Sequence, residues 1–259
     1  MRLDRRIGLF VVLATIFVVS LVVGDIIGGK LLDIRLFGHT FNVTVGMIPF
    51  PVTFLLTDVL NEFYGKRSAR FVTWVGFAMA LFSFTIIFIA AALPISEIAK
   101  GAAWTGVRED AFNNVLAGGQ RILIASMIAY LISQFSDIAV FNLLKRLAKN
   151  RFLWLRATGS TVVSQMIDTV VINTVAWYGI MTADQIFNIA VSSYVIKLIV
   201  AIGLTPLIYA GHVIVERMLH MKPVILDENG EPIEHPGDPI RAIDAARPDY
   251  ATEPPPPAK

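Results

Sequence analysis

A polar pattern, Ser-Gln-x-x-Asp-x-x-Val-x-Asn, occurs twice in the chain. The first copy begins at Ser133 and the second at Ser164, 31 residues further on. Each copy lies inside a segment that is apolar enough to cross a membrane, where a carboxylate or an amide is costly unless it has a partner. The doubled pattern therefore predicts that something polar is held within the membrane.

Within each copy, the glutamine and the aspartate share one helical face, because they are three positions apart. The two pairs are Gln134 with Asp137 and Gln165 with Asp168. Consecutive spanning helices run antiparallel, so we expect the two faces to oppose each other and the four side chains to line one site. In the alternative interpretation, the serines, glutamines and asparagines, Asn173 included, only join helices through hydrogen bonds of ~0.6 kcal/mol each.

Another polar face is predicted earlier in the chain, where Asp58, Asn61 and Glu62 fall on one side of a helix. Two carboxylates one turn apart repel each other unless a cation, a proton or a ligand donor lies between them. Asp58 is therefore expected to be protonated, to pair with a base or to bind a ligand. For Glu62, an ion pair at the membrane interface with Lys66 and Arg67 is an equal alternative.

Lys197 is the only base that the sequence places deep within a predicted span. It either neutralises Asp137 or Asp168, competes for a carbonyl group of a ligand, or extends towards the outer face. Asp25, which precedes a Gly-Gly pair, is expected in a turn at the membrane interface.

The elements that must position these side chains follow from composition. Hydrophobic residues make up 55% of the 259 residues and only 16% are charged, against about 25% in an ordinary soluble domain. Because a spanning helix needs ~20 mostly apolar residues, we predict an all-α, polytopic membrane protein with six transmembrane helices. These helices cover residues 7–27, 43–64, 71–93, 122–144, 157–180 and 189–215. Pro49 and Pro51 are expected to break or kink the second one.

Lysine and arginine are distributed unevenly between the two sides of this predicted bundle, thirteen against five. Since cytoplasmic loops hold the excess, both termini are predicted to be cytoplasmic. From Lys222 onward the chain becomes acidic and holds nine of its thirteen prolines, a composition that buries too little apolar surface to fold. We therefore predict a transmembrane domain at residues 1–221 and a disordered cytoplasmic tail at 222–259.

Several kinds of chemistry are not expected. Cysteine is absent and the four histidines are scattered, so neither a metal site nor a cofactor is predicted. The chain has no G-x-x-x-x-G-K-[ST] loop for ATP hydrolysis. An intramembrane enzyme with paired aspartates is the alternative of a different class, but no Gly-x-Gly-Asp context surrounds Asp137 or Asp168. We predict that the protein is not an enzyme.

The segment from Phe50 to Lys66, FPVTFLLTDVLNEFYGK, closely resembles the signature of the queuosine precursor transporter family, also called vitamin uptake transporters. Segments 133–142 and 159–173 are also similar to that family, and the resemblance spans about residues 7–220. It implies import of 7-cyano-7-deazaguanine or 7-aminomethyl-7-deazaguanine across the bacterial inner membrane, for salvage into the queuosine of transfer RNA.

A base of this kind suits the residues above. Its guanine-like edge presents adjacent N–H donors, which a carboxylate accepts together, and its O6 accepts from an amide or a lysine. Phe54, Phe135 or Trp177 could stack on the ring. The predicted substrate-binding residues are the polar side chains within the spans: Asp58, Asn61, Glu62, Gln134, Asp137, Gln165, Asp168, Asn173 and Lys197.

The resemblance implies two partners, the small base and the lipid bilayer, and no nucleic acid. A homodimer and association with coupling subunits both stay open. So does the source of energy, since the chain could act as a facilitator, use a proton through a membrane carboxylate, or serve as the substrate-binding subunit of an ATP-driven complex.

Overall fold

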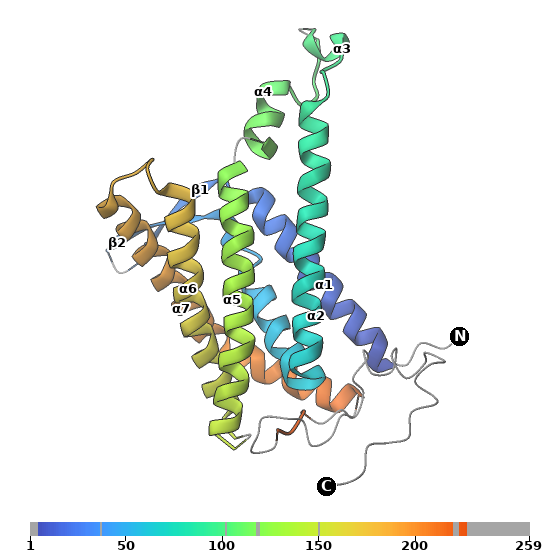
Figure 1. Cartoon of the computed structure of the whole chain (residues 1–259), viewed down its shortest axis with the longest axis vertical. Coiled ribbons are helices and arrows are strands. Elements are labelled where there is room, and N and C mark those ends of the chain that lie inside the picture. The colour runs from blue at the N-terminus through green and yellow to red at the C-terminus, as the bar shows by residue number, and fades with distance from the viewer. Residues whose placement is uncertain are drawn as a thin grey trace.

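The computed structural model describes residues 5–36, 38–101, 103–117, 120–149, 151–219 and 223–226. It is mostly helical (Figure 1). The long helices are α1 (Arg5–Ile27), α2 (Phe50–Ala92), α5 (Gln120–Leu147), α6 (Leu153–Trp177) and α7 (Ala183–Leu219). The connection from α2 to α5 contains the short elements α3 (Glu97–Lys100), α4 (Glu109–Phe112) and the π-helical turn η2 (Asn113–Ala117).

A β-hairpin follows α1, which corrects the all-α prediction. Strands β1 (Leu31–Leu36) and β2 (His39–Thr44) pair antiparallel and lead into the 3₁₀ turn η1 (Val45–Met47). The helix predicted to begin at residue 43 therefore begins at Phe50. Pro49 is its N-cap residue and Pro51 lies in its first turn, where the missing N–H costs nothing because first-turn N–H groups have no helical partner. The prolines thus begin this helix and do not kink it.

The break in α2 lies at Gly65 instead. Its backbone angles, φ 79° and ψ 172°, fall in a region that essentially only glycine occupies. Helical residues continue on both sides, and the chain turns back on itself at this point (Figure 1). The two segments of α2, residues 50–64 and 66–92, correspond to the second and third predicted helices, so the predicted loop between them is a tight break.

Four helical stretches among the described residues are long and apolar enough to cross a membrane: Arg6–Ile27, Val45–Ala92, Leu123–Leu147 and Ala183–Arg217. The second stretch contains 48 residues because it runs through the break at Gly65. Helix α6 has 25 residues but is richer in serine, threonine and amide side chains, so it does not reach the same hydropathy.

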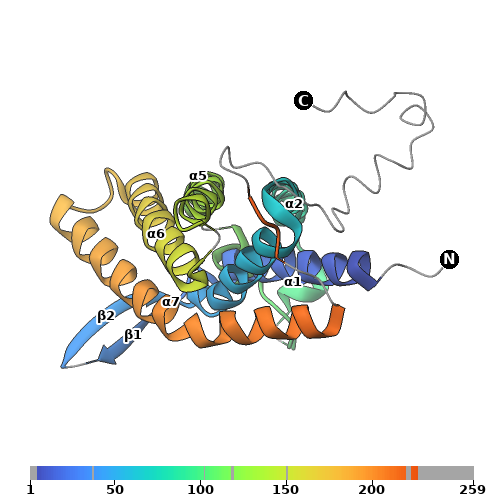
Figure 2. The same cartoon turned by 90° about the horizontal axis from the view of Figure 1, so that it is seen from below.

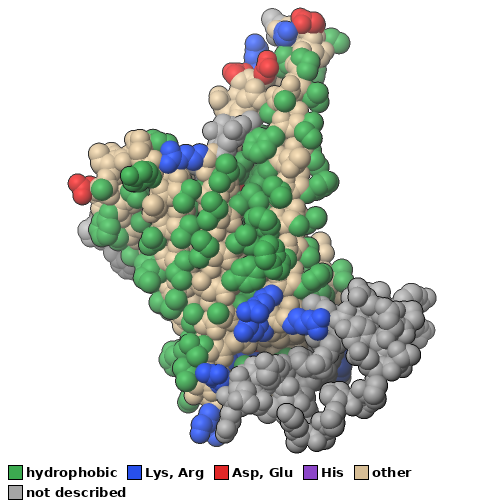
Figure 3. All heavy atoms as spheres, in the orientation of Figure 1, with side chains coloured by type: hydrophobic (Ala, Val, Ile, Leu, Met, Phe, Trp, Pro, Cys, Tyr) green, Lys and Arg blue, Asp and Glu red, His purple; other side chains and the backbone are tan. Residues whose placement is uncertain are grey.

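The helices form one bundle in which α5 packs along α6, α1 along α2, and α6 against α7 (Figure 2). An apolar core between α1, α2 and α5 includes Phe17, Leu60, Phe63 and Tyr130. Large apolar side chains such as Phe82 are exposed on the outside, and they cover the middle of the bundle (Figure 3). A soluble protein rarely exposes so much apolar surface, so this belt faces lipid and the chain is a membrane protein.

Most of the predicted tail, 222–259, lies outside the described residues. Of this segment, 223–226 are described, and they contact the bundle. The N–H of Val224 donates to the carbonyl oxygen of Glu62 at 2.9 Å, and the side chains of Val224 and Leu226 are buried.

Candidate functional site

The two copies of the repeated pattern bind each other reciprocally. Ser133 on α5 donates its hydroxyl hydrogen to Asp168 on α6 at 3.2 Å, and Ser164 on α6 donates to Asp137 on α5 at 3.0 Å. Serine and aspartate are four positions apart in each copy, so they share a helical face. Because the two helices are antiparallel, the serine of each copy meets the aspartate of the other. The two faces therefore oppose each other, as predicted.

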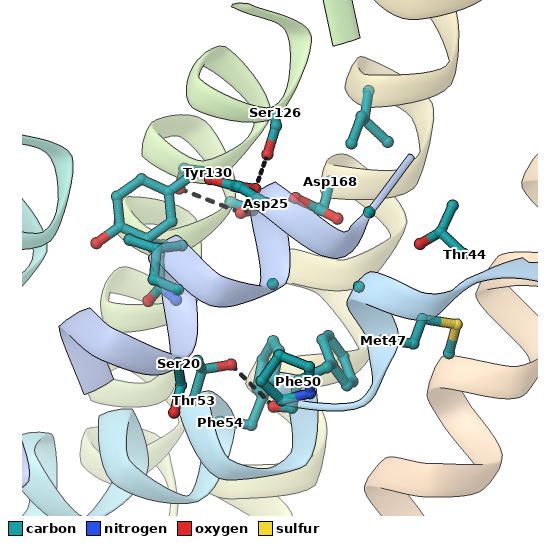
Figure 4. Close-up of a pocket in the computed structure, with 18 of the residues that line it drawn as sticks. Ser20, Asp25, Thr44, Met47, Phe50, Thr53, Phe54, Ser126, Tyr130 and Asp168 are labelled. Carbon is teal, nitrogen blue, oxygen red and sulfur yellow. Dashed lines mark hydrogen bonds between the residues drawn. The ribbon is translucent and has the colours of Figure 1, made fainter. Parts of the chain in front are cut away.

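A cavity of about 190 Å³ lies on one side of this contact, large enough for several waters or a small ligand. Side chains from α1, η1, α2, α5, α6 and α7 form its wall (Figure 4). Its main polar groups are Asp25, Thr53, Ser126, Ser133, Gln134, Gln165, Asp168 and Lys197. Three of the four residues predicted to share one site, Gln134, Gln165 and Asp168, line this cavity.

Close backbone contact brings η1 to the cavity. A Cβ atom at Gly46 would lie 2.7 Å from the carbonyl oxygen of Gly24 and 3.2 Å from the Cα of Gly28. Only glycine permits this approach, because any side chain would clash with the backbone of α1. The glycines near the end of α1 therefore allow η1 and the beginning of α2 to close one side of the cavity.

Lys197 is the counter-ion of Asp168. Its ammonium group lies 2.6 Å from the carboxylate of Asp168 and 5.3 Å from the centre of the Phe50 ring. Of the three roles predicted for this lysine, neutralising Asp168 is the one that the structure shows. Lys197 consequently lies on the cavity wall, between an ion pair and an aromatic face.

Asp25 is a cavity residue that the sequence interpretation missed. It lies in the last turn of α1, where Ser126 donates a hydrogen bond to its carboxylate at 2.5 Å. Figure 4 shows its carboxyl group beside that of Asp168. A carboxylate within an apolar helix, with Gly24 and Gly28 on either side, was the available signal. When all three are ionised, the two carboxylates and one lysine of the described lining give the cavity one excess negative charge.

The two glutamines bring buried amide oxygens that no described residue satisfies. Gln134 and Gln165 are 7% and 3% exposed, and neither Oε1 atom has a hydrogen-bond partner among the described residues. Leaving a buried acceptor unpaired costs about 1–3 kcal/mol. Both residues line the cavity, so these unpaired acceptors mark its wall as a candidate binding site.

Aromatic rings cover the part of the wall formed by α2. Phe50 and Phe54 line the cavity with their ring centres 4.3 Å apart. Of the three rings considered for stacking, Phe54 is on this wall. Phe135 packs against Trp74 instead, with ring centres 5.5 Å apart, and Trp177 is the last residue of α6, away from the described cavity lining.

The other predicted residues, apart from Asn173, belong to a second polar group, which we call the inner cluster. It consists of Asp58, Asn61, Glu62, Asp137, Lys145 and Arg156, all buried. Glu62 binds Lys145 at 3.1 Å and Arg156 at 2.6 Å. Of the two alternatives given for Glu62, the ion pair with Lys66 and Arg67 is not the one formed, because its partners are bases of α5 and α6.

The two bases of the inner cluster also correct the predicted boundaries of the helices that contain them. Lys145 and Arg156 were assigned to a loop, yet they lie within α5 and α6 and are 1% and 4% exposed. Lys197 is consequently not the only base within the bundle. Burial of a base requires a counter-charge, and Glu62 supplies it for both.

The asparagines that end the two copies have equivalent local roles. The side-chain amide of Asn142 donates to the carbonyl oxygen of Ile138, and that of Asn173 to the carbonyl oxygen of Thr169, both at 2.7 Å. Asn142 also donates to Asn61 at 3.0 Å. Asn173 does not belong to the described cavity lining. The bond of Asn142 to Asn61 joins α5 to α2, whereas the bond of Asn173 stays within α6, and neither contact indicates a ligand.

A bundle of apolar helices that encloses a polar cavity is an arrangement typical of membrane transporters. Comparison with known proteins agrees with this class. Residues 44–211 match the family described as "Putative vitamin uptake transporter". The chain belongs to this family, so the resemblance seen in the sequence is confirmed, and the protein is a transporter and not an enzyme.

Two curated relatives cover most of the bundle. The chain is 35% identical over 179 residues to a "Probable queuosine precursor transporter" of Bacillus subtilis, which covers 69% of this chain and 74% of the relative. It is 30% identical over 165 residues to the "Queuosine precursor transporter" of Escherichia coli, which covers 62% of this chain and 69% of the relative. No solved structure matches the chain.

Proposed function

We propose that the protein imports queuosine precursors, namely 7-cyano-7-deazaguanine, 7-aminomethyl-7-deazaguanine or both. The observation that carries the proposal is the pair of cavity-lining glutamines, one from each copy of the repeat, whose Oε1 atoms have no hydrogen-bond partner among the described residues. The names of the two relatives support the choice of ligand. Salvage of the base into transfer RNA is the purpose of this import.

The cavity offers complementary groups for such a base. Adjacent N–H donors on the guanine-like edge suit a carboxylate, and Asp25 is the better acceptor because Asp168 already binds Lys197 and Ser133. The amides of Gln134 and Gln165 then bind the remaining donors and acceptors of the ring. Phe50 and Phe54 provide a face for stacking.

We assign the inner cluster to closure of the path on the cytoplasmic side. Its members Asp58, Asn61, Glu62 and Asp137 lie outside the described lining of the cavity. Salt bridges and hydrogen bonds among buried groups hold α2, α5 and α6 together at this level. An ion-paired layer of this kind can separate and re-form in two discrete states, as alternating access requires.

For the topology we propose six crossings of the inner membrane with both termini cytoplasmic. Residues 45–64 form the second crossing and 66–92 the third, with the reversal at Gly65, and α6 forms the fifth beside α5. The second crossing contains only a short helix that begins at the cavity, as interrupted helices at transporter binding sites do. Lys and Arg side chains gather at the end of the bundle that contains this reversal (Figure 3), which fits a cytoplasmic face.

A bacterial strain that cannot synthesise deazaguanines tests the proposal. With this chain expressed and either base supplied, queuosine should appear in its transfer RNA, whereas a Gln134→Leu, Gln165→Leu double variant should give little. Asp184→Asn, which changes an exposed residue in the first turn of α7, is the control. If membrane levels are equal and the double variant restores queuosine as well as the control, the cavity is not the binding site.

A further inference from the structure

A second, much smaller void lies next to the cavity. It measures about 10 Å³ and is lined by Asp58 together with apolar side chains and two threonines, Thr158 and Thr161. Phe50 and Phe54 line both spaces. These two aromatic rings are therefore the partition between the cavity proposed for the base and the carboxyl group of Asp58.

The carboxyl group of Asp58 is unpaired within the part of the chain that the structure describes. It is 3% exposed, and neither of its oxygen atoms has a hydrogen-bond partner among the described residues. The neighbouring acids differ, since Ser164 donates to Asp137 and two bases bind Glu62. A buried, unpaired carboxylate anion is far more costly than the neutral acid. Among these three acids, Asp58 is therefore the one that holds a proton at least cost.

The charges around Asp58 require one such proton. Asp58 interacts electrostatically with Glu62 on its own helix, with Asp137 on α5 and with Arg156 on α6. Glu62 in turn contacts Lys145 on α5, Arg156 on α6 and His212 on α7. Among the described residues, three acids and two bases leave one excess negative charge when the histidine is neutral. A single proton on Asp58 balances the inner cluster.

A metal cation fits this void less well than a proton. Besides Asp58, the only side-chain oxygens of its described lining are the hydroxyls of Thr158 and Thr161. Thr161 donates its hydroxyl to the carbonyl oxygen of Ala157 at 3.0 Å, so it is already engaged. Hard cations need about six or more oxygen ligands, and a volume of about 10 Å³ is near the lower limit for one water.

Resting on the proposed function, we propose that Asp58 is a proton-binding site and that uptake of the base is coupled to entry of one proton through it. The base binds on one side of Phe50 and Phe54, and Asp58 lies on the other. Movement of this aromatic partition during transport connects Asp58 first with the cavity and then with the cytoplasm. The proton leaves Asp58 to water on the cytoplasmic side, and the carboxylate is protonated again from the outer side.

Purified protein in liposomes tests this coupling. The probes are radiolabelled 7-cyano-7-deazaguanine, which is neutral, and a pH-sensitive dye inside the vesicles, with the membrane potential held at zero by potassium and valinomycin. With the outside one pH unit more acidic, one proton per base allows accumulation up to about tenfold. Addition of base should also acidify the interior. Asp58→Asn should bind the base in detergent within about twofold of the wild type, yet show neither accumulation nor acidification.

Asp184→Asn is again the matched control and should behave as the wild type in both measurements. The inference is overturned if the wild type takes up base equally with and without the pH gradient, if a sodium gradient replaces it, or if Asp58→Asn still acidifies the vesicles. If Asp58→Asn no longer binds the base, Asp58→Glu, which keeps a titratable carboxyl group, should bind the base and acidify the vesicles, and binding without acidification in this variant also overturns the inference. If instead the proposed function is wrong, the protein neither binds the base nor takes it up under any gradient.

Discussion

Replacing Gln165 by leucine separates a ligand-binding role from a role in joining helices. The Oε1 atom of Gln165 has no described protein partner, and the side chain is 3% exposed on the cavity wall. Leucine is one bond shorter than glutamine and has no polar atoms. If glutamine is present for a ligand, the substitution should reduce affinity without weakening the fold. If it joins helices, the fold should weaken.

The contacts of Gln165 determine the expected changes in affinity for the base and in the free energy of unfolding. A base that loses one amide partner keeps an unpaired polar group in the site, which costs about 1–3 kcal/mol and weakens binding by roughly 5- to 150-fold. The free energy of unfolding should not fall, because Gln165 makes no described hydrogen bond that leucine would remove. Replacing an unpaired buried amide by an apolar group is nearly neutral or stabilising.

Asn142→Leu is the contrasting variant. Asn142 donates to Asn61 at 3.0 Å and to the carbonyl oxygen of Ile138 at 2.7 Å, so leucine there should lower the free energy of unfolding by about 1–3 kcal/mol. Isothermal titration with each base and thermal unfolding in detergent measure the two quantities. A lower melting temperature for Gln165→Leu, with affinity unchanged, would refute the assignment of this glutamine to the ligand.

Three further substitutions have defined outcomes. Glu62→Gln leaves two buried bases without their counter-charge and should cost about 3–5 kcal/mol, seen as a melting temperature well below that of the exposed control Glu216→Gln. Asp25→Asn removes the excess negative charge of the cavity and should weaken binding of the cationic 7-aminomethyl base more than that of the neutral 7-cyano base, measured by titration. Gly65→Ala forces alanine to φ 79° and should destabilise by about 1–3 kcal/mol. Gly203→Ala, in a helix with open space around it, should not lower the melting temperature.

The apolar segments predicted most of the helices, because a spanning helix is specified by a long local run of apolar residues. The prediction that the two copies of the repeat oppose each other is also confirmed, since it needs only helical periodicity and antiparallel neighbours. The largest differences lie in the first half of the chain. Residue 43 belongs to a hairpin, and Gly65 reverses the chain without a loop, because backbone pairing and a single glycine conformation leave little trace in hydropathy.

The sequence could not predict which buried charged side chains pair, because pairing depends on the depth and rotation of each helix. A shift of one turn decides whether Lys145 and Arg156 lie in a loop or reach Glu62, and their positions near helix ends favoured the loop. Asp25 was missed for a similar reason. Its role depends on the approach of η1 to α1, a contact between segments whose register the sequence pattern does not specify.

The repeat explains why the bundle contains two polar layers and why they differ. The serine and aspartate contacts are the same in both copies, but α7 adds Lys197 to Asp168, whereas Asp137 faces the unpaired Asp58. Each layer then holds one carboxylate more than its bases can balance. A low-dielectric interior does not tolerate such an excess, so something outside the protein must offset it in each layer. The donors of a bound base can do so at the open cavity, and only a proton fits the void beside Asp58.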